Sequence, residues 1–410
     1  MTTPTPIMPL DDVRIIDLTH MTAGPFGTRI LGDYGADVIK IERPETGDPT
    51  RSMPPFHKDI PGPERSGLFL FLNTNKRSIT LNLKSERGRG LLRDLVRDAH
   101  IVVESFAPGT LDALGLGYAD LKKINPRLVM TSLTNYGQDG PYRDYLGIEL
   151  NLYAMGGSMI SAGDVDHEPL KTAGRMVSYH AGYVAALASA MGLFQVEFQD
   201  AEGDYMDVSI FETAMHSIDM RLGRLMGYQY TGHMASRPAR ATAVGGGVHP
   251  CSDGYFLMTG GPRFIPNIIQ MMGMEEMLEQ PEWGTPEGRA HPDRIDEFLP
   301  HIIPWTLERT KEEVRQAAEK HAVLGAPLNT MEDLFNNEQF VARDYFQEID
   351  HPETGAIKYP GFHNRLHREG ADMPPRRRAP LLGEHTEEVL TGILGLTRQD
   401  IAALRKDGVV

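Results

Sequence analysis

The sequence predicts an α/β protein built on a parallel sheet, and three features of the chain support this. Residues 13–18 (VRIIDL) are apolar enough for a strand buried on both faces, and an Ala-Gly-Pro turn separates them from a helical run at residues 26–34. A second strand is expected at residues 37–42, which completes a β-α-β unit. Strand-like runs then alternate with helical patterns, at residues 78–83, 101–105, 128–133 and 205–210. This alternation predicts a sheet with helices on both faces.

Two helices are predicted from their patterns of apolar residues. In residues 86–99, leucine and valine recur at helical spacing between charged residues, which indicates a helix that covers the sheet. Residues 181–194 form the longest nearly apolar run, which is shorter than the roughly 18 residues that suggest a membrane span. We therefore expect a buried helix there and no membrane segment.

The length of 410 residues exceeds what one hydrophobic core usually organises, so about two or three domains are expected. We assign residues 1–225 to the N-terminal part of a large ligand-binding domain. After these residues the pattern changes to a strand-like run followed by helical segments. We therefore assign residues 226–335 to a small domain. Residues 336–410 contain several prolines and end in amphipathic helices. We interpret them as a crossing segment that returns to the large domain.

Composition excludes several classes of function. A formal net charge of −15 argues against general nucleic-acid binding, which needs a basic surface. Cys251 is the only cysteine, so an intrachain disulfide and a cysteine-based zinc cluster are impossible, and no metal site is expected. The first residues lack the cationic and apolar segments of a signal peptide. These features favour a cytoplasmic protein that binds neither nucleic acid nor membrane.

The β-α-β unit at residues 17–51 is the best candidate for a ligand site. Ligands of open α/β sheets bind at turns that follow a strand, and the turn before residue 26 is rich in small residues. Arg43 follows the second strand, where its guanidinium group can bind a phosphate or stack on a purine ring. The chain has neither a G-x-G-x-x-G motif nor a P-loop lysine motif. The turn and Arg43 together nevertheless indicate an anionic, nucleotide-like ligand.

Five longer segments carry a resemblance to a known family. They are THMTAGPFGTRILGDYGADVIKIERPETGDPTR, LNTNKRSITLNLKSERGRGLL, VVESFAPGTLDALGLGYADL, NPRLVMTSLTNYGQDGPY and APLLGEHTEEVL. Together they resemble the family III CoA-transferases, the group that includes formyl-CoA transferase and carnitine CoA-transferase. The resemblance implies a Rossmann-like large domain whose parallel sheet is built from both chain ends, a smaller α+β domain, and an interlocked, ring-like dimer.

The resemblance also implies where coenzyme A or an acyl-CoA binds, with no metal ion. It places the cofactor-binding residues at His20, Met21, Thr22, Ala23, Arg43, Leu81, Lys84, Ser105, Phe106 and Thr110. The first four are expected along the pantetheine and thioester region, and Arg43 is expected at the adenine and phosphate end. From the residues alone, Arg43 is also compatible with a surface cation, and Leu81 with plain core.

A run of three glycines resembles the substrate loop of the family. Gly245, Gly246 and Gly247 carry no side chains, so their backbone can approach a ligand closely. A flexible domain linker is the alternative. Related transferases carry glutamine at the positions of Thr22 and Val248, so this chain lacks two amides that can orient an acyl oxygen.

The family's reaction uses an aspartate that attacks an acyl-CoA thioester and later holds CoA as an aspartyl thioester. Its D-x-x-x-G pattern corresponds here to residues 178–182, and a family acid that positions the acyl group corresponds to Glu149. The nucleophile position is therefore Ser178, which has no carbonyl with which to capture CoA. The acid/base pair of the related α-methylacyl-CoA racemases falls on Ile148 and Ser178, so racemisation is disfavoured more strongly than transfer.

Three functions are compatible with this pattern. The first is a CoA-transferase that moves CoA between an acyl-CoA, such as succinyl-CoA, and a carboxylic acid. In it, this chain is paired with a homologous subunit that carries the aspartate, in a heterodimer or heterotetramer, as in enzymes resembling succinyl-CoA:benzylsuccinate CoA-transferase, or it forms a homodimer. The second is a self-sufficient acyl-CoA isomerase or lyase in which Glu149 is the base or nucleophile. The third is a CoA-binding protein without catalytic activity.

Overall fold

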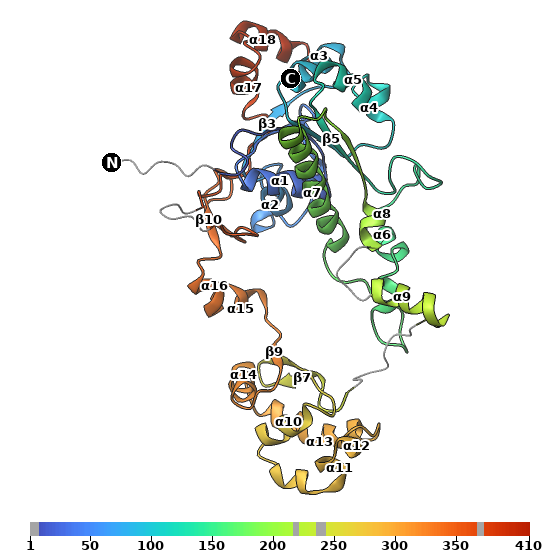
Figure 1. The fold of residues 1–410 in the computed structure, drawn as a ribbon. Coiled ribbons are helices and arrows are strands. Elements are labelled where there is room, and N and C mark those ends of the chain that lie inside the picture. Colours follow the sequence, from blue (N-terminus) through green and yellow to red (C-terminus); the bar gives the residue numbers. More distant parts are fainter. Residues whose placement is uncertain (1–7, 216–220, 235–242, 367–372) are drawn as a thin grey trace. The chain divides into compact units, whose positions relative to one another are not determined.

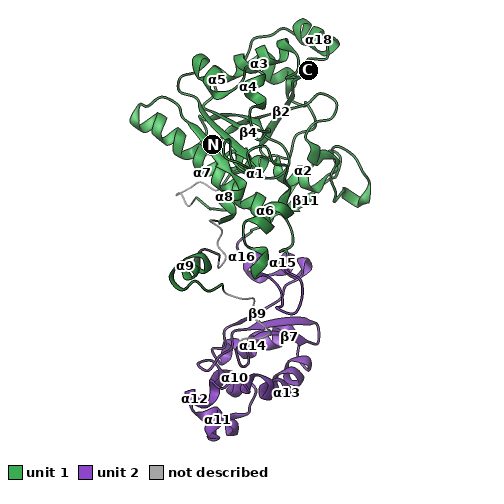
Figure 2. Ribbon diagram, turned by 90° about the vertical axis from the view of Figure 1, so that its right-hand side faces the viewer, with its two compact units in different colours: residues 1–161, 170–234, 344–410 green, residues 162–169, 235–343 purple. Residues whose placement is uncertain are grey.

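The computed structural model describes residues 8–215, 221–234, 243–366 and 373–410, which form two compact units (Figure 2). The large unit contains residues 1–161, 170–234 and 344–410, and the small unit contains residues 162–169 and 235–343. The chain therefore leaves the large unit once for the bulk of the small unit and then returns to it.

A six-stranded parallel sheet organises the large unit (Figure 1). Its strands are β1 (Arg14–Leu18), β2 (Asp37–Glu42), β3 (Lys76–Thr80), β4 (Ile101–Glu104), β5 (Val129–Thr134) and β6 (Tyr205–Ser209). Their order in the sheet is β3-β2-β1-β4-β5-β6, and every neighbouring pair is parallel. The first three strands extend the sheet to one side of β1, and the next three extend it to the other side. The strand order therefore reverses between β1 and β4, and ligands of open α/β sheets bind at such a reversal. The predicted α/β class is confirmed.

The described C-terminal residues supply helices to this unit, whereas all six strands of its sheet come from residues 14–209. The resemblance had implied a sheet with strands from both ends of the chain. Apolar residues recur at helical spacing in α17 (Thr386–Gly392) and α18 (Arg398–Lys406). They pack in the same hydrophobic core as Ile79 of β3. Both parts of the chain therefore build the large unit, but only the first half builds its sheet.

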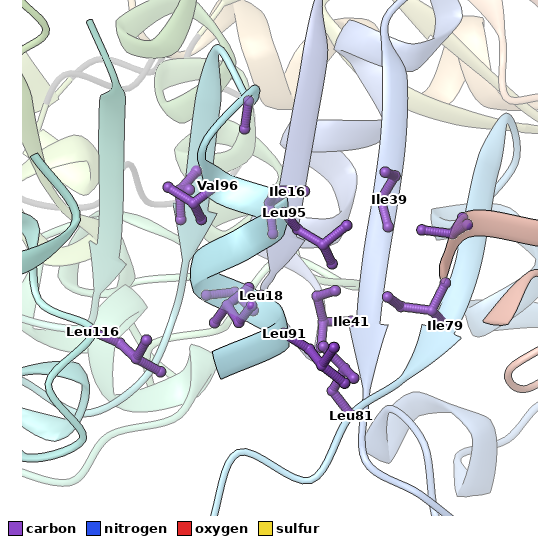
Figure 3. Packing of buried hydrophobic residues seen from close by; sticks show 14 of the residues in the cluster. Ile16, Leu18, Ile39, Ile41, Ile79, Leu81, Leu91, Leu95, Val96 and Leu116 are labelled. Atoms are coloured by element: carbon purple, nitrogen blue, oxygen red, sulfur yellow. The ribbon is translucent and has the colours of Figure 1, made fainter. Parts of the chain in front are cut away.

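Alternate residues of the strands point to opposite faces of the sheet and form two cores. Ile16 lies in one core with residues of α3 (Glu86–Val96), and Figure 3 shows Leu91 and Leu95 of that helix against the strands. Ile15 lies in the other core with residues of α1 (Ala23–Asp33) and α7 (Met176–Gln199). Shorter helices complete the unit: α2 (Gly67–Leu72), α4 (Thr110–Ala113), α5 (Tyr118–Ile124), α6 (Glu149–Met155), α8 (Ile210–Met215) and α9 (Arg221–Thr231).

Helices α1 and α7 cross at two glycines. A Cβ atom on Gly182 would lie 2.6 Å from the carbonyl oxygen of Ala23, and one on Gly27 would lie 2.7 Å from the carbonyl oxygen of Gly182. Only glycine at these positions permits so close an approach of the two backbones. The crossing brings the N-terminal end of α7 close to the turn that follows β1.

Helix α7 is longer and more exposed than the sequence predicts. Only one face of it is buried, while Leu187, Met191, Phe194 and Phe198 are between 55% and 75% exposed. A continuous apolar run hides the periodicity that separates a buried face from an exposed one. The helix expected to be buried is therefore buried on one face only. By length and composition, α7 is the one helix in the described part of the chain able to cross a membrane, but half of its most apolar window is buried in the large unit.

The small unit has its own α+β core. An antiparallel sheet of β7 (Gly247–Cys251), β8 (Gly254–Met258) and β9 (Gly325–Pro327) packs on helices through Phe256, Ile268 and Phe298. The helices are α10 (Ile265–Met271), α11 (Pro281–Gly284), α12 (Pro286–Arg289), α13 (Arg294–Leu307), α14 (Lys311–Lys320), α15 (Met331–Asn336) and α16 (Glu338–Ala342). This matches the smaller α+β domain that the resemblance implies.

The returning segment is anchored to the large unit by a buried ion pair. It first forms an antiparallel hairpin of β10 (Gln347–Ile349) and β11 (Ile357–Tyr359). Arg376 then pairs with Asp33 of α1, with 2.6 Å between Nη2 and Oδ2, and neither side chain is exposed. The backbone N–H of Asn75 donates to the carbonyl of Arg377 at 3.1 Å, which fixes the chain beside the start of β3.

Candidate functional site

The turn at residues 20–23, at the carboxyl end of β1, is held in place by neighbouring side chains. The backbone N–H of His20 donates to Oγ of Ser105 at 3.1 Å, and that of Met21 donates to Oδ1 of Asp48 at 3.4 Å. Met21 has a φ of +67°, a left-handed conformation that costs free energy in a residue other than glycine. Asp48 is itself fixed by buried Lys40, whose Nζ lies 2.9 Å from Oδ2. The turn is therefore a rigid, preorganised part of the structure.

A second buried ion pair lies directly below this turn. Asp17, on β1, accepts hydrogen bonds from Thr19 and Thr28, and its Oδ2 lies 2.9 Å from Nζ of Lys76. Burial alone would raise the pKa of Asp17, but the charges of Lys76 and Lys40 and the hydrogen bonds lower it well below its usual range. Burial lowers the pKa of Lys76 to about 8, against the opposing effect of Asp17. These charges serve to hold the turn, because none of them is exposed.

The first of two cavities lies on the β2 and β3 side of the turn and has a volume of about 620 Å³. Six of the predicted coenzyme residues line it: His20, Arg43, Leu81, Lys84, Phe106 and Thr110. Arg43 and Lys84 are exposed, and neither forms an ion pair with a carboxylate of the described residues. Leu81 is buried in the core and lines the cavity as well, so it fits both interpretations. Two free cations on this wall suit an anionic ligand.

A second, larger cavity of about 910 Å³ lies on the other side of the turn. It is lined by the predicted residues His20, Met21, Thr22, Ala23, Ser105, Phe106, Glu149 and Ser178. His20 and Phe106 line both cavities, and their ring centroids are 5.5 Å apart. Burial lowers the pKa of His20, with a smaller opposing effect from Asp48, which favours the neutral ring. The structure thus brings together all ten predicted coenzyme residues and both predicted catalytic residues around two adjoining cavities.

Glu149 and Ser178 are in direct contact, a point that the sequence left open. Oε2 of Glu149 accepts hydrogen bonds from Oγ of Ser178 at 2.6 Å and from its backbone N–H at 3.0 Å. Oε1 accepts from the backbone N–H of Val177 at 2.9 Å. The carboxylate therefore caps the N-terminal end of α7, where unpaired N–H groups and the helix dipole favour a negative charge.

The glycine run lies in the small unit, and none of its three residues is among those that line either cavity. Gly245 and Gly247 have φ values of +69° and +114°, and a Cβ atom on Gly246 would lie 2.8 Å from the backbone nitrogen of Gly260. These residues form a tight turn packed against a neighbouring strand end, so they are not a flexible linker. Val248 follows in β7 and is 54% exposed.

Sequence reasoning missed three residues of the site. Asp48 and Lys40 fix the turn at residue 21 through contacts that no local pattern reveals. Arg175 lines the larger cavity, and its Nη1 donates to Oγ1 of Thr22 at 2.8 Å. A cation three residues before Ser178 was the signal that could have found Arg175.

Comparison with known proteins shows the family of this chain. Residues 10–386 match CoA-transferase family III. The chain is 32% identical to the formyl-CoA:oxalate CoA-transferase of Streptomyces avermitilis, over 98% of this chain and 99% of that protein. It is 31% identical to the succinyl-CoA–D-citramalate CoA-transferase of Chloroflexus aurantiacus, over the full length of both.

A solved structure supports the same assignment. The chain superposes on a CaiB/BaiF family protein from Brucella suis with a TM-score of 0.82 and 30% identity, covering 95% of this chain and 100% of that one. The match in sequence extends over nearly the whole chain, and the solved fold extends over both units. This chain therefore belongs to CoA-transferase family III.

Proposed function

We propose that this protein binds acyl-CoA and takes part in the transfer of CoA between an acyl-CoA, such as succinyl-CoA, and a carboxylic acid. In this proposal the chain is the subunit without the nucleophile, paired with a homologous chain that carries the aspartate. One observation carries the proposal. The predicted coenzyme residues line two adjoining cavities, and Ser178, the expected nucleophile position, has its hydroxyl bound to Glu149.

The chemistry of transfer explains why Ser178 is decisive. A carboxylate attacks the thioester carbonyl, expels the CoA thiolate and becomes a mixed anhydride; the thiolate then attacks the enzyme's acyl carbon and releases the free acid. The resulting enzyme thioester passes CoA to the second acid by the reverse steps. An alkoxide from Ser178 can accept the acyl group, but it offers no carbonyl carbon to the thiolate.

Glu149 is poorly placed to replace the missing aspartate. Both of its oxygens accept hydrogen bonds from the first turn of α7, and these bonds occupy lone pairs that a nucleophile needs. An attack through Glu149 would also break the cap of a helix that is 24 residues long. These contacts support a positioning role for Glu149.

The activities of the relatives and an apolar face support the rest of the proposal. The relatives named above transfer CoA between acids, as their names state. Leu187, Met191, Phe194 and Phe198 form an exposed apolar face on α7, which is a surface that soluble proteins usually cover. We propose that the protein is cytoplasmic and that a second subunit, homologous or identical, covers this face. The glycine turn at residues 245–247 stays the proposed substrate loop.

A second candidate function rests on the same hydrogen bond. With 2.6 Å between Ser178 Oγ and Glu149 Oε2, the carboxylate is within reach to act as a general base toward the hydroxyl. A self-sufficient enzyme acting on acyl-CoA would then use these two residues alone. A CoA-binding protein without chemistry is the third candidate, and it would show binding with neither acyl transfer nor hydrolysis.

Two measurements test the proposal together. Calorimetry with CoA should show binding by the chain alone, and absence of heat at millimolar CoA contradicts every candidate. Transfer of CoA from succinyl-CoA to a carboxylic acid should appear only when a homologous subunit with the aspartate is co-expressed. Full transferase activity of a preparation that contains this chain alone contradicts the subunit proposal.

A further inference from the structure

We propose that Arg175 binds a free carboxylate on the acyl group, so that the larger cavity accepts acyl-CoA thioesters of dicarboxylic acids. This inference rests on the proposed function, because it assumes that an acyl-CoA occupies the site. It adds the chemical class of the acyl group and the residue that selects it.

Arg175 is held at the wall of the larger cavity by residues on both sides of it. It is the residue before α7, it is half-buried, and its Nη1 donates to Oγ1 of Thr22, whose side chain is buried. Its Nη2 lies 3.9 Å from the sulfur of Met53. A guanidinium group has five N–H donors, so these contacts leave donors for a ligand. The side chain is therefore fixed in place but not saturated.

The charges that line the larger cavity do not cancel. The charged side chains on its wall are those of Arg143, Asp144, Glu149, Lys171 and Arg175. The carboxylate of Glu149 is used by the first turn of α7, and Asp144 pairs with Arg143 at 3.2 Å. Among the described residues, no carboxylate pairs with Arg175 or Lys171.

Lys171 is the second cation on the wall of the larger cavity that pairs with no carboxylate of the described residues. Nζ of Lys171 donates to the backbone carbonyls of Thr172 and Gly174, at 2.8 and 2.6 Å, and so shapes the loop that leads into Arg175. Its charge adds to the positive potential of the wall. A partly desolvated cation without a counter-ion is costly, so the geometry favours an anion from the ligand.

The position of Arg175 assigns this anion to the acyl group. The unpaired cations Arg43 and Lys84 line the other cavity, beyond the His20–Phe106 pair, and suit the phosphates of CoA. Arg175 lines only the cavity that contains Ser178 and Glu149, where the thioester is expected. A thioester of a dicarboxylic acid keeps one free carboxylate, which a guanidinium group binds through two parallel hydrogen bonds.

The experiment compares two ligands with equal chain length, succinyl-CoA and butyryl-CoA, together with CoA itself. Equilibrium binding to the full-length protein, with its partner where one co-purifies, gives the ratio of the two acyl-CoA affinities. We expect the wild type to prefer succinyl-CoA by about tenfold or more, as for a charged hydrogen-bonded pair. Arg175→Met should reduce the preference to near unity, while the affinities for butyryl-CoA and CoA change much less than the affinity for succinyl-CoA and by equal amounts, because both ligands contact the turn that Arg175 holds through Thr22.

Two further variants keep the test sharp. Arg175→Lys retains the charge and should keep part of the preference, which separates charge recognition from a folding defect. Arg97→Met is the matched control, because Arg97 is exposed and pairs with Asp94 on the surface. It should change none of the three affinities.

The possible failures are distinguishable. If neither CoA nor butyryl-CoA binds to the wild type, the proposed function fails, and this inference fails with it. If both bind but succinyl-CoA has no advantage, only this inference is overturned. An equal loss of affinity for all three ligands in Arg175→Met would overturn it too, since Arg175 would then bind the part that CoA and both thioesters share.

Discussion

The hydroxyl group of Ser178 donates a hydrogen bond to Oε2 of Glu149 over 2.6 Å. The two residues are 29 positions apart in the sequence, and this bond joins the start of α6 to the first turn of α7 beside the larger cavity. Ser178, which we propose stands at the position of the family's nucleophile, is therefore a hydrogen-bond donor that helps to fix the cap of a helix.

Removing the charge of Glu149 should weaken the start of α7. In Glu149→Gln the side chain can still accept one or two of the three hydrogen bonds, but the favourable interaction with the helix dipole is lost. We expect the free energy of unfolding to fall by about 1 kcal/mol. Denaturant unfolding measures this, with Glu197→Gln, near the other end of α7, as the matched control. Equal stability of both variants would show that Glu149 does not act as a cap.

Adding one methyl group at Gly182 should disturb the crossing of α1 and α7. The new Cβ atom would meet the carbonyl oxygen of Ala23 at 2.6 Å and the ring of Phe26 at 3.0 Å, so a helix has to shift. We expect Gly182→Ala to lower the free energy of unfolding by about 1–3 kcal/mol. Gly90→Ala in α3, where no neighbour lies within 4 Å, should instead be neutral or stabilising. A harmless Gly182→Ala would contradict the close crossing.

Removing the cation at Arg43 should weaken binding of the phosphate end of CoA. Because Arg43 is exposed, screening limits the effect, and we expect Arg43→Ala to reduce the affinity for CoA by about threefold to tenfold at low salt. The loss should shrink as salt rises. Pantetheine, which lacks the nucleotide phosphates, should bind equally to wild type and variant. A loss of pantetheine affinity would place Arg43 elsewhere along the ligand.

Glu104 should make the stability of the large unit depend on pH. Burial, with smaller effects of Asp112 and Asp207, raises the pKa of this carboxyl from 4.5 to about 7. The folded protein therefore binds the proton more tightly than the unfolded chain. The stability contributed by Glu104 is fully present below about pH 4.5 and is lost as the pH rises through about 7.

The matching variant is Glu104→Gln, which does not titrate and can still accept the hydrogen bond of 2.7 Å from the backbone N–H of Phe106. Its advantage over the wild type in free energy of unfolding should grow by roughly 2–3 kcal/mol between pH 5 and pH 8. Glu197→Gln, at an exposed position, should show no such growth. A constant difference between Glu104→Gln and wild type across this range would contradict the raised pKa.

Local patterns in the sequence predicted the strands well, because runs such as residues 13–18 must be apolar to lie between two layers of helices. The order of the strands in the parallel sheet depends on long-range packing, which no single run encodes, and so does the fact that the described C-terminal residues add no strand to that sheet. The exposed face of α7 was missed because its exposed positions, such as Leu187 and Phe194, are as apolar as its buried ones. The residues named from the family motifs line the two cavities. The hydrogen bond between Ser178 and Glu149, however, could be identified only from the folded structure.

Arg175 and Asp48 show the same limit within the site. Each acts on the turn at residues 20–23 from a distant part of the chain, through the hydroxyl of Thr22 or the backbone of Met21. Their roles depend on where the loops pass, and loop geometry was not predictable from composition or spacing.

The most direct test is the intact mass of the wild-type chain after incubation with succinyl-CoA, in the absence of any other subunit. Ser178→Asp, which restores a carboxylate at this position, provides the comparison and should gain a CoA adduct that hydroxylamine removes. The account predicts that the wild-type chain binds the ligand and keeps its unmodified mass. A wild-type chain that carries CoA on Glu149, or a succinyl group on Ser178, would contradict it.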